Sequence, residues 1–62
     1  MSTLFAERLV GEHKLLAERI DKLTAVMAST EYEDAYDKML SGFQLSHMRK
    51  YLNVLDRRIE RL

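Results

Sequence analysis

The chain contains no cysteine, proline or tryptophan, and only two of its 62 residues are glycine. Without cysteine it can form neither a disulfide bond nor a thiolate metal site. A domain of about 60 residues buries only about 60% of the surface that its unfolded chain exposes, so small domains usually need such a support or a partner chain. The sequence therefore predicts one domain of well-packed helices that is stabilised by homo-oligomerisation.

The chain also lacks an excess of charge of either sign. Ten Lys and Arg residues balance ten Asp and Glu residues, which argues against a nucleic-acid-binding protein and against an acidic disordered tail. No apolar run reaches the length of about 18 residues that a membrane-spanning helix needs. Residues 1–5 lack the features of an export signal, and Glu7 and Glu12 argue against an import presequence. We therefore expect a cytoplasmic protein with no membrane partner.

Apolar residues recur at alternating steps of four and three in the first half of the chain, which is typical of one face of a helix. This first seam consists of Leu9, His13, Leu16, Ile20, Leu23 and Met27. Ser2 or Thr3 can cap the start of the helix with a side-chain oxygen. The pattern predicts a helix over about residues 3–28.

A second seam with the same alternating steps occupies the last part of the chain. It consists of Leu45, Met48, Leu52, Leu55, Ile59 and Leu62. Between the seams, Thr30-x-x-Glu33 fits a capping box and predicts a turn over about residues 29–33. Acidic residues concentrate just after this turn and arginines near residue 61, which is the distribution that the helix dipole favours. A second helix is therefore predicted over about residues 34–62.

Ser41 and Gly42 interrupt the second helix, where glycine costs about 1 kcal/mol relative to alanine. They indicate a break in the helix, which is either a kink near residues 41–42 or a short separate helix over 31–40, or else a close approach by a neighbouring helix. Gly11 raises the same two alternatives in the first helix. The sequence does not decide between them.

Together these patterns predict an all-α fold, an antiparallel two-helix hairpin that spans residues 1–62 as a single domain. Two helices share only one line of contact, so a lone hairpin leaves part of its apolar surface in water. The residues that we expect outside this line are Leu40, Phe43, Tyr51 and Val54. A second hairpin could cover them in a four-helix bundle, and a homodimer is the commonest arrangement of this kind.

His13 stands in the first seam, where Leu or Ile is usual. It is either a ligand-binding or proton-handling imidazole in the bundle core, or a half-buried histidine whose nitrogens reach water or a carboxylate. The acidic and histidine residues show no Glu-x-x-His or His-x-x-x-His spacing, so we expect neither a metal site nor a cofactor. Ser46 and His47 are merely adjacent, and no glycine-rich loop is present. We therefore expect that the protein is not an enzyme.

Basic residues of the second helix concentrate towards the open end of the predicted hairpin, with a tyrosine among them. Guanidinium groups bind phosphate in a bidentate manner, and an aromatic ring can stack on a base. The patch could therefore hold a small anionic nucleotide; the alternative is a solvated helical face on which Asp56 and Glu60 pair with neighbouring arginines. The candidate ligand-binding residues are Arg8, His13, Arg49, Lys50, Tyr51, Arg57 and Arg58.

The second helix carries the pattern Gln44-Leu45-x-x-Met48-x-x-Tyr51-Leu52-x-x-Leu55-x-x-Arg58-Ile59. Glu12-x-x-Leu15 and Asp21-Lys22-Leu23 precede it in the first helix. Over nearly the whole chain, these motifs resemble a family of short helical-hairpin proteins of tailed bacteriophages, crAss-like phages included. The architecture also looks like that of the phage anti-CBASS and anti-Thoeris sponges, which sequester nucleotide immune signals.

The resemblance implies a phage accessory protein that binds a cyclic nucleotide or an ADP-ribose-type ligand without catalysis, in the cytoplasm of the host cell. In that interpretation, arginine and lysine side chains neutralise phosphates, and Tyr51 or Tyr36 stacks on a base. The alternative is a homo-oligomeric adaptor that binds a host or phage protein through its helical surface.

Overall fold

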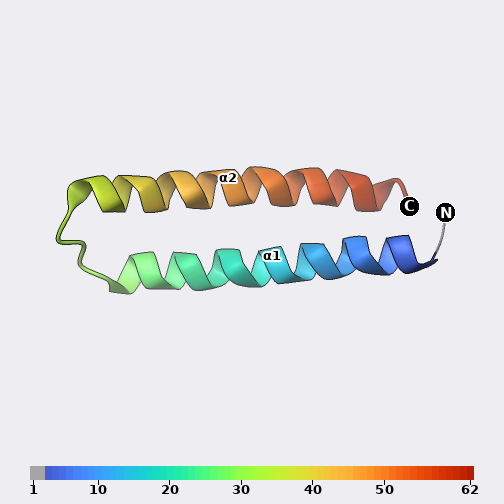
Figure 1. Cartoon of the computed structure of the whole chain (residues 1–62), viewed down its shortest axis with the longest axis horizontal. Coiled ribbons are helices and arrows are strands. Elements are labelled where there is room, and N and C mark those ends of the chain that lie inside the picture. Colours follow the sequence, from blue (N-terminus) through green and yellow to red (C-terminus); the bar gives the residue numbers. More distant parts are fainter. Residues whose placement is uncertain (1–2) are drawn as a thin grey trace.

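Two antiparallel helices joined by a short loop form the computed structural model, which describes residues 3–62 (Figure 1). Helix α1 spans Thr3–Ser29 and helix α2 spans Ala35–Glu60. The part of the chain that the structure describes contains no strand, so the predicted all-α hairpin is confirmed. Ser2, which we considered as a cap of α1, lies outside the described residues.

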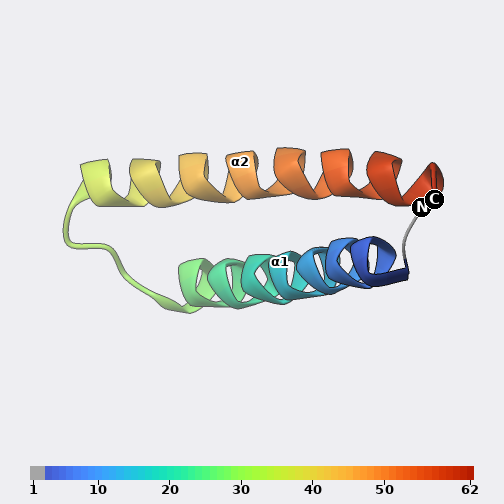
Figure 2. The same ribbon diagram turned by 45° about the vertical axis from the view of Figure 1, so that its right-hand side comes forward.

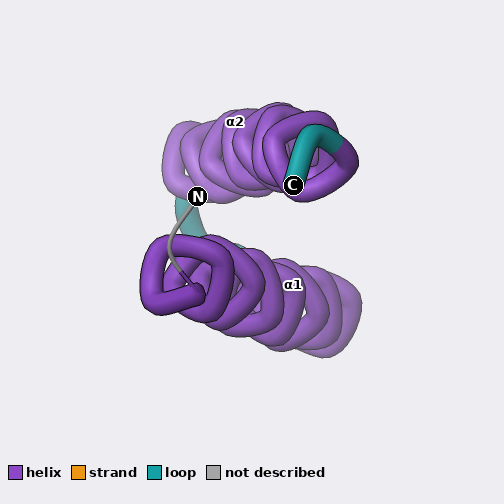
Figure 3. The backbone as a smooth tube through the Cα atoms, turned by 90° about the vertical axis from the view of Figure 1, so that its right-hand side faces the viewer, coloured by secondary structure: helices purple, strands orange, loops and turns teal. Residues whose placement is uncertain are grey.

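The two helices run side by side over most of their length, as the views in Figures 1 and 2 show, and α2 extends beyond α1 at the loop end. The hairpin measures 48 × 15 × 13 Å. In the end-on view of Figure 3, no third element covers the outer side of either helix over residues 3–62. The radius of gyration of the hairpin is 14.6 Å, whereas a compact domain of this length has a radius of gyration of about 10.6 Å. The chain is therefore a rod with a large surface for its mass.

Asp34 begins α2, and its capping contact corrects our prediction of a capping box formed by Thr30 and Glu33. The Asp34 side chain accepts a hydrogen bond from the Tyr36 N–H at 2.8 Å, and the Asp34 backbone is extended. The Thr30 N–H donates to the Val26 carbonyl at 2.9 Å, so Thr30 completes the end of α1 rather than starting α2. Asp37 lies in the first turn of α2, and Arg57 and Arg58 lie in its last turn, where they complement the helix dipole.

Helix α2 continues through Ser41 and Gly42 without a break, so the structure shows no separate helix over residues 31–40. A Cβ atom placed on Gly42 or on Gly11 would meet no other atom within 4 Å. Within one hairpin, neither glycine is therefore needed for a close approach between the helices.

Ten apolar residues of the two predicted seams form the contact between α1 and α2. Five of them are buried, namely Leu9, Leu16, Ile20, Leu45 and Leu55, and Leu23, Met27, Met48, Leu52 and Ile59 pack around these five. Leu55 is the most completely enclosed, with no exposed surface. Leu62 is 49% exposed, which corrects its placement in the second seam. Leu40, Phe43, Tyr51 and Val54 are exposed, as predicted.

Candidate functional site

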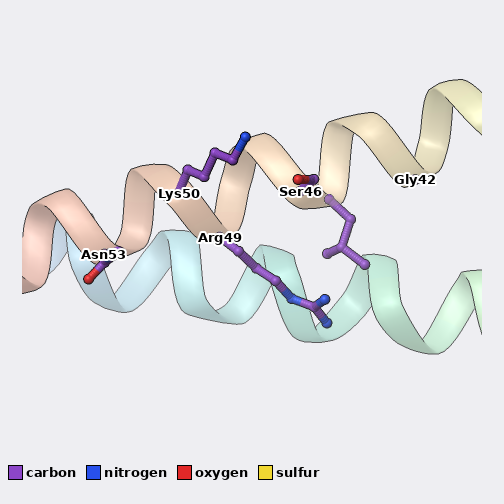
Figure 4. A pocket seen from close by; sticks show the side chains of 6 residues that line it. Gly42, Ser46, Arg49, Lys50 and Asn53 are labelled. Carbon is purple, nitrogen blue, oxygen red and sulfur yellow. The ribbon is translucent and has the colours of Figure 1, made fainter.

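A shallow groove on α2 brings together two of the predicted ligand-binding residues. Its lining residues are Gly42, Leu45, Ser46, Arg49, Lys50 and Asn53, and its volume is about 330 Å³ (Figure 4). Most of these residues follow one another at steps of three or four, so the turns of α2 stack them on one side of the helix. Gly42 contributes no side chain and Ser46 only a small one, which leaves a hollow beside Leu45 and Arg49.

The groove carries positive charge and hydrogen-bonding groups. Arg49 and Lys50 are both exposed, and their side chains extend from α2 in different directions (Figure 4). No acidic residue lines the groove, and among residues 3–62 neither cation has a carboxylate within ion-pairing distance. Ser46 and Asn53 add a hydroxyl and an amide. This combination can bind a phosphate or another small anion, because charge-assisted hydrogen bonds to anions are the strongest that these side chains make.

His13 lies away from the groove and contacts Asp56. Its Nε2 atom is 2.5 Å from Oδ1 of Asp56, and the two side chains are 30% and 51% exposed. The sequence suggested that Asp56 could pair with arginines of its own helix, and the structure instead places it against His13. Here His13 is the partly buried histidine at the edge of the seam that reaches a carboxylate, and the contact joins α1 to α2.

Arg58 lies near the open end of the hairpin, where it stacks on an aromatic ring. Its guanidinium carbon is 5.9 Å from the centroid of the Phe5 ring. Sequence reasoning missed Phe5, because only the alignment of the two helices reveals this cation–π contact. The structure leaves Arg8, Tyr51 and Arg57 exposed and outside the groove. The seven predicted residues thus do not converge on a single site.

A second hollow, at the loop, has the opposite charge. Thr30, Glu31, Tyr32, Glu33, Asp34 and Asp37 line it. Four of these six residues are acidic, so this end of the hairpin repels anions. The groove on α2 is therefore the better candidate site for an anionic ligand.

A family model matches residues 3–61, nearly the whole of the chain. The chain belongs to the Sequestin family. The name of the family suggests sequestration of a target. Neither a curated protein sequence nor a solved structure matches the chain. Neither helix of the described Sequestin-family hairpin is long and apolar enough to cross a membrane.

Proposed function

We propose that this Sequestin-family chain binds and sequesters a small anionic nucleotide signal, without catalysing a reaction. The observation that carries the proposal is the groove in which Arg49 and Lys50 stand without an acidic partner. A ligand with two or more phosphate groups would gain most from two cations that extend in different directions. The resemblance to phage proteins favours an immune signal of the host as the ligand, and the host cytoplasm as the place of action.

A second candidate function is an adaptor that binds another protein, and one specific observation favours it. Twelve large apolar side chains of the described hairpin are at least 43% exposed. Such a surface is typical of a protein–protein contact. An adaptor would need neither the groove nor its two cations, so the two functions predict different effects of the same mutations.

The experiment that tests sequestration is a thermal-shift screen with cyclic dinucleotides, cyclic trinucleotides and ADP-ribose-derived signals. A ligand present at about 100 times its Kd stabilises a protein by about 2.7 kcal/mol, which corresponds to about 10–20 °C for a domain of this size. We expect the shift to shrink at high salt, because salt screens the attraction between exposed charges. Adenosine, which has no phosphate, should cause no shift.

The double substitution Arg49→Ala/Lys50→Ala should abolish the shift while leaving the helical content unchanged. A matched control is Lys14→Ala/Lys38→Ala, which removes two exposed positive charges that do not line the groove. We expect this control to bind like the unmodified chain. Equal loss in both variants would contradict a site in the groove, and the absence of any shift would favour the adaptor.

A further inference from the structure

The hairpin exposes more surface than a stable monomer of its mass. Its accessible surface is 5108 Å², whereas a folded monomer of 7.3 kDa exposes about 4,200 Å². The excess of about 900 Å² is close to the roughly 800 Å² that each partner contributes to a stable protein–protein interface. A partner that covers one long side of the hairpin would account for this excess.

The exposed apolar residues favour one long side over the other. In an antiparallel helix pair, the residues that immediately precede a seam residue in the sequence lie on one long side of the pair, whichever helix they belong to. The residues that immediately follow a seam residue lie on the opposite long side. The Arg58–Phe5 contact belongs to the first side, and Asp56 and the groove residues belong to the second. The first side, which we name the apolar face, carries six exposed large apolar residues: Phe5, Leu15, Val26, Leu40, Tyr51 and Val54.

The groove side carries fewer large exposed apolar residues than the apolar face. Besides Arg49 it carries Ala17, Thr24, Gly42 and Ser46, and Val10 is a large apolar residue there that is 50% exposed. A partner gains little by covering this side. The contrast between the two sides makes the apolar face the candidate interface.

The contact between His13 and Asp56 shows which residues of α1 and α2 lie at the same level along the hairpin. Counting from this contact, Leu15 lies level with Val54. Within one residue, Glu12 lies level with Arg58 and Arg19 lies level with Tyr51. Along the apolar face, neighbouring levels thus hold an apolar pair, an opposite-charge pair and a cation with an aromatic ring.

Two arrangements could place a second copy against this face with two-fold symmetry. In the first arrangement both loops lie at the same end, and α1 of one copy packs on α2 of the other. Residues at a given level along one hairpin then face the residues at the same level along the partner. Leu15 then contacts Val54 of the partner, Glu12 approaches Arg58 of the partner, and Arg19 approaches Tyr51 of the partner. Each of these contacts is favourable.

When the loops lie at opposite ends, each helix packs on its own copy. If the two hairpins overlap along their full length, Arg19, which lies near the middle of the hairpin, would then meet Arg19 of the partner, and Leu15 would meet Lys22 of the partner. Like charges and a charge against an apolar side chain make this arrangement less favourable. The first arrangement also has unfavourable contacts between the acidic loops and between Arg8 and Arg61, which lie at the exposed ends, where solvent screens them. By the same count, Lys22 lies level with His47 of the partner, a contact that adds nothing to this arrangement.

We propose that a second copy of this chain covers the apolar face, with both loops at the same end, to form a parallel four-helix dimer. This interface buries Tyr51 and Arg58, which removes them from the predicted ligand site. It leaves the groove side of each copy open. The dimer does not depend on the proposed function, but together they imply one ligand per chain, bound at separate grooves.

A pair of matched substitutions tests which face forms the interface. Val54 is 52% exposed on the apolar face and Val10 is 50% exposed on the groove side, so both can be replaced by Glu without creating a buried charge in the hairpin. We expect Val54→Glu to weaken the dimer more than about 100-fold, because it places two charges in the interface. Val10→Glu should leave the dimer unchanged. Sedimentation equilibrium measures both, with circular dichroism as the control for folding.

A spin label on the loop tests the orientation. The chain has no cysteine, so Glu31→Cys gives a single labelling site on an exposed loop residue. In the proposed dimer the two labels lie less than about 25 Å apart, because neighbouring helix axes are about 8–10 Å apart. In the opposite orientation their separation approaches the 48 Å length of the hairpin.

Four results would overturn the proposal. They are a monomer at all concentrations, an oligomer larger than a dimer, equal weakening by the two glutamate substitutions, and a label separation near the length of the hairpin. If the chain dimerises but no tested ligand raises its melting temperature, only the proposed function is contradicted. A high salt concentration distinguishes the two proposals further. It should weaken ligand binding, but it should not weaken the dimer, because it also screens the repulsion between the two acidic loops.

Discussion

His13 shows how a polar residue can stand in an apolar seam without forming a ligand site. Its ring remains partly exposed at the edge of the seam, and its Nε2 atom reaches Asp56 on the other helix. Because both side chains are partly exposed, water screens this contact, and we expect it to contribute no more than about 1 kcal/mol. It therefore joins the two helices without deciding how they align.

Replacing His13 by Leu should therefore stabilise the hairpin. Leucine restores the usual residue of the seam, buries more apolar surface and has the higher helix propensity, for an expected gain of about 1 kcal/mol in the free energy of unfolding. Urea unfolding measures this change. Ligand binding should be the same as in the unmodified chain, and a loss of binding in a stabilised His13→Leu variant would return His13 to the ligand site.

The sequence identified His13 as unusual but did not identify its partner. Spacing along one helix indicates only neighbours three or four residues away, so the only partners that the sequence suggested for Asp56 were arginines of its own helix. The contact depends on how the two helices align, and this alignment follows from the length of the loop. The same limit hid the contact between Phe5 and Arg58.

At the scale of the elements, the alternation of four and three residues was sufficient to predict both helices. The periodic residues of each seam face the other helix, and tertiary packing confirms nearly all of them. The ends of the helices were harder to predict, because several neighbouring polar residues could each cap the same helix. Thr30, Glu33 and Asp34 all have capping side chains, and only the backbone conformation selects Asp34.

The capping contact of Asp34 leads to a test within the loop. We expect Asp34→Ala to lower the free energy of unfolding by about 0.5–2 kcal/mol, because the Tyr36 N–H loses its hydrogen-bond acceptor. Glu33→Ala is the matched control, since it removes the neighbouring carboxylate, and it should change stability by less than about 0.5 kcal/mol. Thermal unfolding of the two variants compares them, and a larger effect of Glu33→Ala would favour the capping box after all.

The two glycines offer a second test of the elements. Each lies inside a helix and has open space where a Cβ atom would stand. We expect Gly11→Ala and Gly42→Ala each to stabilise the chain by about 1 kcal/mol, because alanine is the better helix former. Urea unfolding measures the gain. A loss of stability at Gly42 would show that a neighbouring chain packs closely there, which would contradict an open groove side in the dimer.

The whole molecule combines a narrow core with two unlike long sides. Sequence reasoning predicted that apolar residues would stay exposed, because their number exceeded what one line of contact can bury. It did not predict the groove, although the small and polar residues that follow the seam at Gly42, Ser46 and Asn53 were a usable signal. It also grouped Arg49 with Arg58, which the structure places on different sides of α2.

The proposed dimer predicts that the melting temperature of the chain depends on its concentration. Association with a second copy stabilises the folded state by mass action, so the Tm should rise as the total protein concentration rises. Differential scanning calorimetry over a wide range of concentrations measures this effect. In Val54→Glu the Tm should be lower and independent of concentration, and a concentration-independent Tm in the unmodified chain would contradict the dimer.

The hairpin topology also bears on how the chain folds. Contacts near the loop close short segments, whereas the contact between His13 and Asp56 spans 43 residues and costs about 1 kcal/mol more in chain entropy than one spanning a third as many. The most enclosed residues, Leu9 and Leu55, nevertheless lie in the half of the hairpin away from the loop. The contacts that are easiest to form are thus not the most stabilising ones. We therefore expect folding in one cooperative step, in which the loop half alone is never a populated intermediate.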